Sequence, residues 1–172
     1  EPFHGFVGRA VAMSALERLL SPEAEESVAW LCGYTGLGKT TLATHLARWL
    51  VRTGRFSRVV YTRFTGGCLP EVALHDLYSC LLGEAHTPDQ SDPLTALTEA
   101  LDQTPTLILW DDIETVLPDG EQPWPAAQLA AAHDLIIRLT NGASRLCLLA
   151  NTPALPAQAE ALAPTDQVSV LT

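Results

Sequence analysis

Short apolar runs alternate along this chain with longer segments whose apolar residues recur every three or four positions. The apolar runs predict buried strands, over residues 28–32, 58–64, 106–110, 145–150 and 168–171. The helical spacing predicts helices between them, over residues 12–20, 40–52, 70–82, 93–102 and 126–139. Strands that are almost continuously apolar and separated by helices indicate a parallel sheet covered on both faces. We therefore expect a three-layer α/β sandwich.

Two stretches lack this periodicity and predict loops. Residues 86–92 are polar, and residues 118–125 hold three prolines and a glycine. The second loop must lie at the surface, because proline and glycine interrupt both helices and strands. Trp124 in this loop is either an exposed contact residue or a packed anchor.

The composition indicates one globular domain. The chain has 172 residues, 47% of them hydrophobic, which suits one core and is short for two. No apolar run approaches the ~20 residues of a membrane span, and no signal-peptide pattern is present. We expect a cytoplasmic domain, residues 1–172, cut from a longer polypeptide. The four cysteines show no C-x-x-C spacing, so we expect them to be reduced.

The charge balance bears on possible partners. Twenty acidic and ten basic residues give a net charge of −10. This charge opposes general attraction to nucleic acid and to anionic lipid, so we expect neither partner.

A phosphate-binding motif follows the first predicted strand. Residues 33–40 read Gly-Tyr-Thr-Gly-Leu-Gly-Lys-Thr, a complete G-x-x-x-x-G-K-[ST] pattern, and Lys39 is the only lysine in the chain. The alternative without ligand binding is a glycine-rich turn with an incidental lysine. The strand before the motif and the helix after it favour phosphate binding, because backbone N–H groups and the helix N-terminus then face the anion. The predicted ligand-binding residues are Gly33, Tyr34, Thr35, Gly36, Leu37, Gly38, Lys39, Thr40 and Thr41.

An acidic pair ends the third predicted strand. Asp111 and Asp112 follow an apolar run, which places their carboxylates at the sheet edge where the phosphate loop opens. We expect Thr40 and Asp111 to hold Mg²⁺, and Lys39 and Asp112 to be catalytic, Asp112 by orienting and deprotonating the attacking water. Glu114 is a fallback base. The alternative for these acids is a purely structural role, in helix capping or in a solvated loop.

Two arginines lie at strand ends. Arg63 ends the second strand near the expected site and is a candidate for the arginine that assists hydrolysis in P-loop enzymes. Arg145 begins the fourth strand and therefore lies at the opposite edge. The arginines near the end of the phosphate-loop helix suit its C-terminal dipole, and the histidines carry no metal spacing.

Together these motifs resemble the signal-transducing STAND ATPases, the class that includes NB-ARC and NACHT proteins. The resemblance rests on Phe6-Val7-Gly8-Arg9, on the loop at residues 33–41 and on residues 107–114. It implies that the first motif packs over adenine, with backbone atoms near Val7 pairing the base and Arg9 close to the nucleotide. It thus implies ATP or ADP, with Mg²⁺, as the cofactor.

The same resemblance implies a sheet of five parallel strands in the order 5-1-4-3-2, so that the Walker B strand (the third) and the sensor strand (the fourth) are adjacent. Many STAND members carry T-[ST]-R after the fourth strand, where this chain has Ala150-Asn151-Thr152. The related AAA+ ATPases commonly use asparagine there. Asn151 is therefore the expected nucleotide sensor and Thr152 a second choice, although Asn151 suits a simple turn equally well.

These features predict a slowly hydrolysing ATP switch whose nucleotide state controls packing against C-terminal domains of the same chain, with homo-oligomerisation in the active state. The alternative is an interaction module that holds ADP without hydrolysis. A small-molecule kinase is disfavoured, because no arginine-rich insertion lies between the third and fourth strands and the loop at residues 118–125 is acidic.

Overall fold

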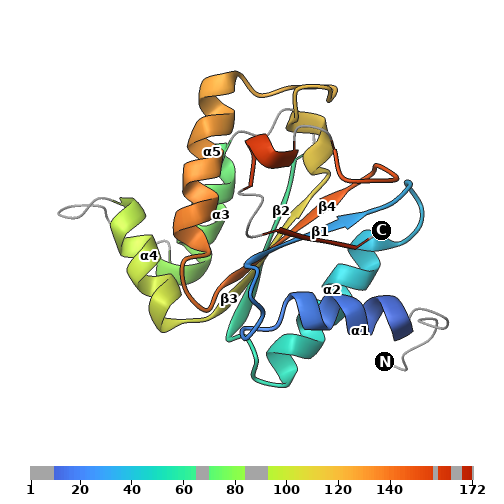
Figure 1. Ribbon diagram of the computed structural model, residues 1–172. Coiled ribbons are helices and arrows are strands. Elements are labelled where there is room, and N and C mark those ends of the chain that lie inside the picture. Colours follow the sequence, from blue (N-terminus) through green and yellow to red (C-terminus); the bar gives the residue numbers. More distant parts are fainter. Residues whose placement is uncertain (1–9, 65–69, 84–92, 157–158, 164–167, 172) are drawn as a thin grey trace.

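A computed structural model describes residues 10–64, 70–83, 93–156, 159–163 and 168–171. Helices and strands largely alternate along the chain, with two helices in succession between the second and third strands among the described elements (Figure 1). The α-helices are α1 (Ala10–Leu19), α2 (Lys39–Arg52), α3 (Pro70–Leu82), α4 (Pro93–Gln103) and α5 (Ala126–Leu139). The strands are β1 (Val28–Cys32), β2 (Arg58–Arg63), β3 (Thr106–Asp111), β4 (Arg145–Ala150) and β5 (Val168–Leu171). Two 3₁₀ turns, η1 (Ile113–Val116) and η2 (Ala159–Ala161), complete the described elements.

The described strands form one parallel sheet in the order β2-β3-β4-β1-β5. The predicted α/β fold with a parallel sheet is confirmed, and so is the position of β4 between β1 and β3. Parallel neighbours bring their carboxyl ends to one edge, and pairing of Cys32 with Ala150 and of Arg63 with Asp111 aligns those ends. This edge collects the motifs that follow β1, β3 and β4.

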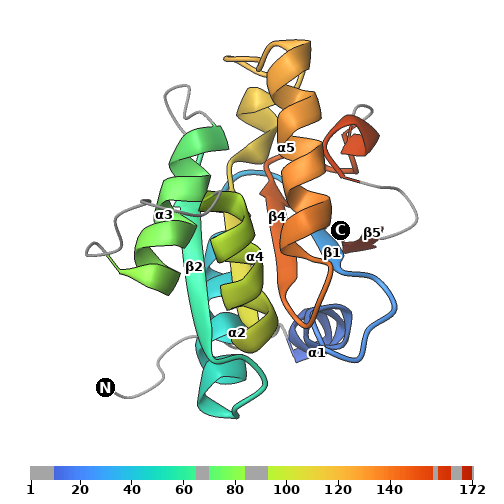
Figure 2. The same ribbon diagram turned by 90° about the vertical axis from the view of Figure 1, so that its left-hand side faces the viewer.

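Helices cover both faces of the sheet, as the apolar strands predict. Helices α1 and α2 pack on one face, and α3, α4 and α5 pack on the other (Figures 1 and 2). Alternate residues of β1 serve the two cores: Ala29 and Leu31 face α1 and α2, whereas Trp30 and Cys32 face the opposite layer. All residues of β1, β3 and β4 are buried, so these three strands form a rigid base for their end loops.

Trp124 is a packed anchor, so the alternative of an exposed contact residue is wrong. Its side chain is buried, and its ring meets that of Phe64 edge-on at a centroid distance of 5.4 Å. The η1 turn was not predicted, because four residues are too few to show helical periodicity. The predicted loop at residues 86–92 lies outside the described residues.

Arg145 lies at the amino-terminal end of β4, away from the site edge, as expected. Its guanidinium donates to the carbonyls of Pro22, Ala24, Gly142 and Ser144 at 2.6–3.2 Å. The residue therefore ties the segment before β1 to the start of β4.

The described helices include none with both the length and the apolar character needed to cross a membrane.

Candidate functional site

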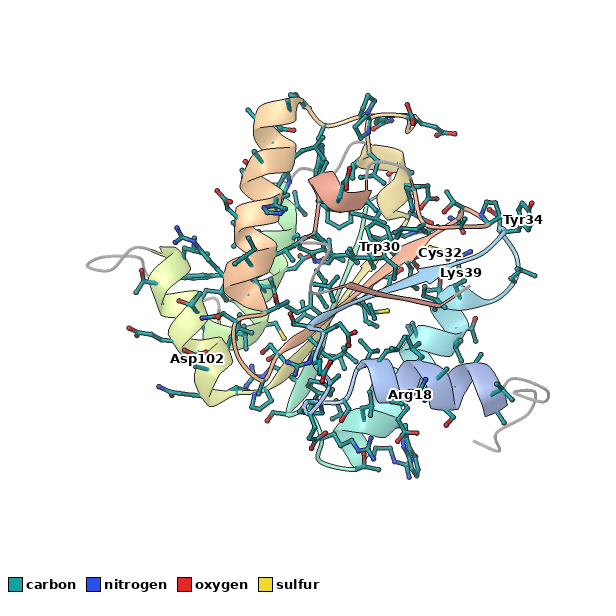
Figure 3. All side chains as sticks on the ribbon, viewed as in Figure 1. Arg18, Trp30, Cys32, Tyr34, Lys39 and Asp102 are labelled. Atoms are coloured by element: carbon teal, nitrogen blue, oxygen red, sulfur yellow. The ribbon has the colours of Figure 1, made fainter. Side chains whose placement is uncertain are left out.

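The phosphate-loop motif lies at the carboxyl edge of the sheet, between β1 and α2. Figure 3 shows Lys39 beside Cys32 at the end of β1, with Tyr34 farther out along the loop. Gly36 and Gly38 have φ of 84° and 77°, in the left-handed region that side chains with a Cβ rarely adopt. Helix α2 begins directly after Gly38, and among the described residues no side chain caps its first N–H groups. Those donors remain directed at the loop, where they suit an anion.

Lys39 is buried, only 6% exposed, beneath this loop. Its Nζ donates to the carbonyl oxygens of Gly33 (2.8 Å) and Tyr34 (3.1 Å) and to Oδ1 of Asn151 (2.7 Å). A buried ammonium is costly unless such acceptors surround it. The loop therefore holds the chain's one lysine with its charge at the centre of the site.

Thr40 and Asp111 come together as the sequence predicts. The Thr40 hydroxyl donates to Oδ2 of Asp111 at 2.7 Å, and the backbone N–H of Asp112 donates to Oδ1 at 3.0 Å. A hydroxyl and a carboxylate are hard oxygen ligands, so the pair fits Mg²⁺ that is completed by phosphate oxygens and water. Within the described ranges, no group of three or more His, Cys, Asp or Glu side chains could hold a metal ion.

Asp112 is held on both carboxylate oxygens. Asn151 Nδ2 donates to Oδ1 at 2.7 Å, and Arg63 Nε donates to Oδ2 at 2.6 Å in a salt bridge. The backbone of Asp112 has φ of 56°, the only positive φ among the described non-glycine residues. The Asp112 carbonyl accepts hydrogen bonds from Thr115, whose N–H and hydroxyl close the η1 turn. The turn and the two side-chain partners together fix the direction of this carboxylate.

Asn151 bridges the phosphate loop and the acidic pair. It follows β4, and its amide accepts from Lys39 while donating to Asp112. The resulting chain of contacts runs from Lys39 through Asn151 and Asp112 to Arg63. Thr152, the second choice for a sensor, donates instead to the carbonyl of Ala154 at 2.6 Å.

A cleft of about 590 Å³ opens beside this network. Thr35 of the phosphate loop, Arg63, Asp112 and Asn151 line the cleft. The other lining residues belong to η1 and the segment that follows it, and to the segment after β4; they are Glu114, Thr115, Leu117, Asp119, Gly120, Glu121, Thr152 and Pro156. The cleft therefore brings together the phosphate loop, Asp112 and Asn151.

The remaining predicted residues divide between exposed and undescribed positions. Tyr34 and Leu37 are 65% and 48% exposed on the loop, and Thr41 is exposed in the first turn of α2. Glu114, the fallback base, is partly buried at the cleft, and its Oε2 has no hydrogen-bond partner among the described residues. The first motif, Phe6, Val7, Gly8 and Arg9, lies outside the described residues.

Sequence reasoning missed one residue of the site, Tyr61 on β2. Its hydroxyl donates to Oδ2 of Asp111 at 2.9 Å. Burial, followed by the interactions with Asp111, raises the pKa of this hydroxyl above its usual range, so it remains a donor. The available signal was spacing: residues two apart on a strand share a face, and Arg63 had already been placed at the site.

A protein-family model described as "AAA domain" matches residues 23–153. This range spans the segment before β1, the phosphate loop, the acidic pair and Asn151. No curated protein sequence matches the chain.

Solved structures with the same fold include chains from ORC proteins and from a Trip13 complex. A chain of Drosophila ORC bound to DNA is 24% identical, with a TM-score of 0.62 over 86% of this chain and 38% of its own. The ORC2 protein of Aeropyrum pernix, in ADPNP and ADP complexes, is 18% identical, with a TM-score of 0.66 over 98% of this chain and 48% of its own. A chain of the E. coli MS115-1 HORMA:CdnC:Trip13 complex is 18% identical, with a TM-score of 0.60 over 96% and 63%. This chain thus spans less than two thirds of each.

Proposed function

Because this chain belongs to the AAA domain family, we propose that it binds ATP with Mg²⁺ at the β1–α2 loop and hydrolyses it slowly. The observation that carries the proposal is the bridge from Lys39 through Asn151 to Asp112, with both hydrogen bonds at 2.7 Å. It connects the group suited to bind phosphate with the group suited to activate water. A glycine-rich turn with an incidental lysine would not require such a bridge.

The loop and the start of α2 bind the nucleotide in this proposal. Backbone N–H groups of residues 34–40 surround the phosphates, and the Lys39 ammonium exchanges a carbonyl contact for a phosphate oxygen. Thr40 and Asp111 hold Mg²⁺, which neutralises charge on the β- and γ-phosphates. Thr40 contributes its hydroxyl oxygen directly, because its proton is already donated to Asp111.

Asp112 orients the water and accepts its proton. Asn151 fixes one oxygen of the carboxylate and leaves the group facing the cleft that Thr35 also lines. The Asn151 amide also keeps Lys39 and Asp112 from forming a direct ion pair, which would neutralise both. These two contacts support Asn151 as the proposed nucleotide sensor.

Arg63 restrains Asp112 in the state described. Its Nε binds the second carboxylate oxygen at 2.6 Å, so the acid is engaged on both sides before any water approaches. Such restraint supports slow turnover. It also favours the second candidate function, an interaction module that holds ADP, if Arg63 never releases the acid.

The finer proposal is a STAND-type switch in which nucleotide state controls packing against C-terminal domains of the same polypeptide and formation of a homo-oligomer. The compared structures support a larger whole, since this chain spans less than two thirds of each. One of them is bound to DNA, whereas the net charge of −10 here opposes general attraction to nucleic acid. We therefore propose protein domains, rather than nucleic acid, as the partners.

Equilibrium binding of a fluorescent ADP or ATP analogue, with and without Mg²⁺, tests the nucleotide site. We expect Lys39→Ala to weaken binding at least tenfold in both conditions, because it removes the charge at the phosphates. Thr40→Ala should remove most of the gain in nucleotide affinity that Mg²⁺ produces. Thr44→Ala is the matched control, since its hydroxyl bonds to backbone carbonyls of the same helix. Unaltered binding by Lys39→Ala would contradict the proposal.

A further inference from the structure

Asp111, the proposed metal-holding acid, needs a carboxylate whose rotation is fixed. Its backbone is anchored by β3 pairing with β2. The side chain is buried, 3% exposed, at the end of that strand. A carboxylate rotates about its own bonds unless its oxygens are held, and a ligand must be held close to one geometry to bind Mg²⁺ well.

Three donors hold this carboxylate, and two of them are hydroxyls on the same oxygen. Oδ2 accepts from Thr40 at 2.7 Å and from Tyr61 at 2.9 Å, while Oδ1 accepts the backbone N–H of Asp112 at 3.0 Å. An ionised carboxylate offers about four acceptor positions, two on each oxygen. Oδ2 is therefore filled, and one position on Oδ1 stays open.

Tyr61 reaches this oxygen from the edge strand. It lies on β2, two residues before Arg63, so both side chains leave the strand on one face. Arg63 holds Asp112 from that face, and Tyr61 holds Asp111. Neighbouring Thr62 points the other way and donates to Asp76 on α3 at 2.7 Å.

Packing alone does not explain why the Tyr61 hydroxyl points to Asp111. Its side chain is 40% exposed on an edge strand, where its hydroxyl would be satisfied by water. The hydroxyl instead turns to the buried acid. A hydroxyl held against one acceptor suits a fixed contact to a carboxylate, and the 2.9 Å hydrogen bond to Oδ2 of Asp111 is such a contact.

We propose that Tyr61 is a positioning residue for metal binding: with Thr40 it occupies Oδ2 of Asp111, so that only Oδ1 can accept a metal-bound water. This inference rests on the proposed nucleotide and Mg²⁺ site. Tyr61 contacts neither metal nor nucleotide in this account and acts through Asp111. Removing its hydroxyl opens one position on Oδ2, in addition to the one on Oδ1, and leaves the carboxylate with two donors instead of three.

The test compares Tyr61→Phe with the native chain and with Thr62→Val, which removes a hydroxyl from the adjacent residue of the same strand. The probe is fluorescent ADP, titrated in EDTA and then at increasing Mg²⁺. For Tyr61→Phe we expect unchanged affinity in EDTA and a rise of about five- to tenfold in the Mg²⁺ concentration at half-saturation, the loss of about one hydrogen bond. Thr62→Val should match the native chain in both titrations.

Three results would overturn the inference. An unchanged Mg²⁺ midpoint in Tyr61→Phe shows that the hydroxyl does not position the metal ligand. Equal loss of affinity in EDTA and in Mg²⁺ assigns Tyr61 a structural role. Failure of the native chain to bind ADP in either condition refutes the proposed function itself, and this inference with it. Thermal unfolding of each variant verifies that the protein compared is folded.

Discussion

Replacement of Asn151 by alanine should uncouple the phosphate loop from the catalytic acid. The substitution removes the acceptor of Lys39 and the donor to Asp112 together, at a point where three chain segments meet. Lys39 keeps its carbonyl partners from Gly33 and Tyr34, so the loop remains formed. Asp112 keeps only Arg63 among its described side-chain partners and is pulled toward that side of the cleft.

The size of the effect follows from the two hydrogen bonds. Each involves a charged group, and such bonds contribute about 1.5–3 kcal/mol. If the bond to Asp112 is needed in the transition state, its loss lowers kcat by about ten- to a hundredfold. The Lys39 ammonium keeps a carbonyl partner and gains a phosphate oxygen when nucleotide binds, so loss of the Asn151 acceptor should lower nucleotide affinity by less than it lowers kcat.

The assay is phosphate release under single-turnover conditions, combined with ADP binding by the same preparations. Asn141→Ala, an exposed asparagine after α5, is the matched control and should behave as the native chain. Asn151→Asp separates the two contacts, because its carboxylate retains the Lys39 partner and repels Asp112. It should bind nucleotide and hydrolyse no faster than Asn151→Ala. Native hydrolysis in Asn151→Ala would refute the bridge as a catalytic element.

Three further predictions test the surroundings of the site. Arg63→Ala should raise basal hydrolysis, because Arg63 restrains Asp112, and should barely change the melting temperature, because the Arg63 side chain is 59% exposed. A fall in the hydrolysis rate would indicate a direct role of Arg63 at the phosphate. Arg145→Ala should lower the free energy of unfolding, measured in urea, by about 2–4 kcal/mol, because four backbone carbonyls lose a charged donor. Arg138→Ala, at an exposed position of α5, is the control, and equal stability of the two variants would contradict this prediction. Burial raises the thiol pKa of Cys147, so at pH 8 iodoacetamide should modify exposed Cys80 and leave Cys147 unmodified until the protein unfolds, as read by peptide mass spectrometry.

Local sequence patterns were sufficient for the elements that carry the site. The strand at Val28–Cys32 and the helix at Lys39–Arg52 are recognisable because apolar spacing and the glycine motif agree within one continuous segment. The parallel sheet follows from the alternation of these elements. Asp111 and Thr40 lie in contact, as their positions after β3 and β1 suggest, because the carboxyl ends of these strands share an edge; their pairing as Mg²⁺ ligands stays a prediction.

Contacts between distant segments were less accessible. Asn151 was equally compatible with a turn, and only packing of β4 beside β1 brings it to Lys39. Tyr61 belongs to no motif, and its contact depends on the β2–β3 register and on which face the strand turns to the site. Trp124 lies in a proline-rich loop whose sequence left its burial undecided, and it is buried with its ring edge-on against Phe64. In each case the deciding partner lies far away in the sequence.

The most direct test of the account is phosphate release from Mg²⁺-ATP by the native chain beside Asp112→Asn. Asparagine retains the shape of the side chain and removes the carboxylate that accepts the proton. We predict slow but measurable hydrolysis by the native chain, a loss of at least a hundredfold in Asp112→Asn, and similar ATP binding by both. Equal hydrolysis rates in the two proteins would contradict the assignment of Asp112, and binding without turnover in either would favour the ADP-holding module.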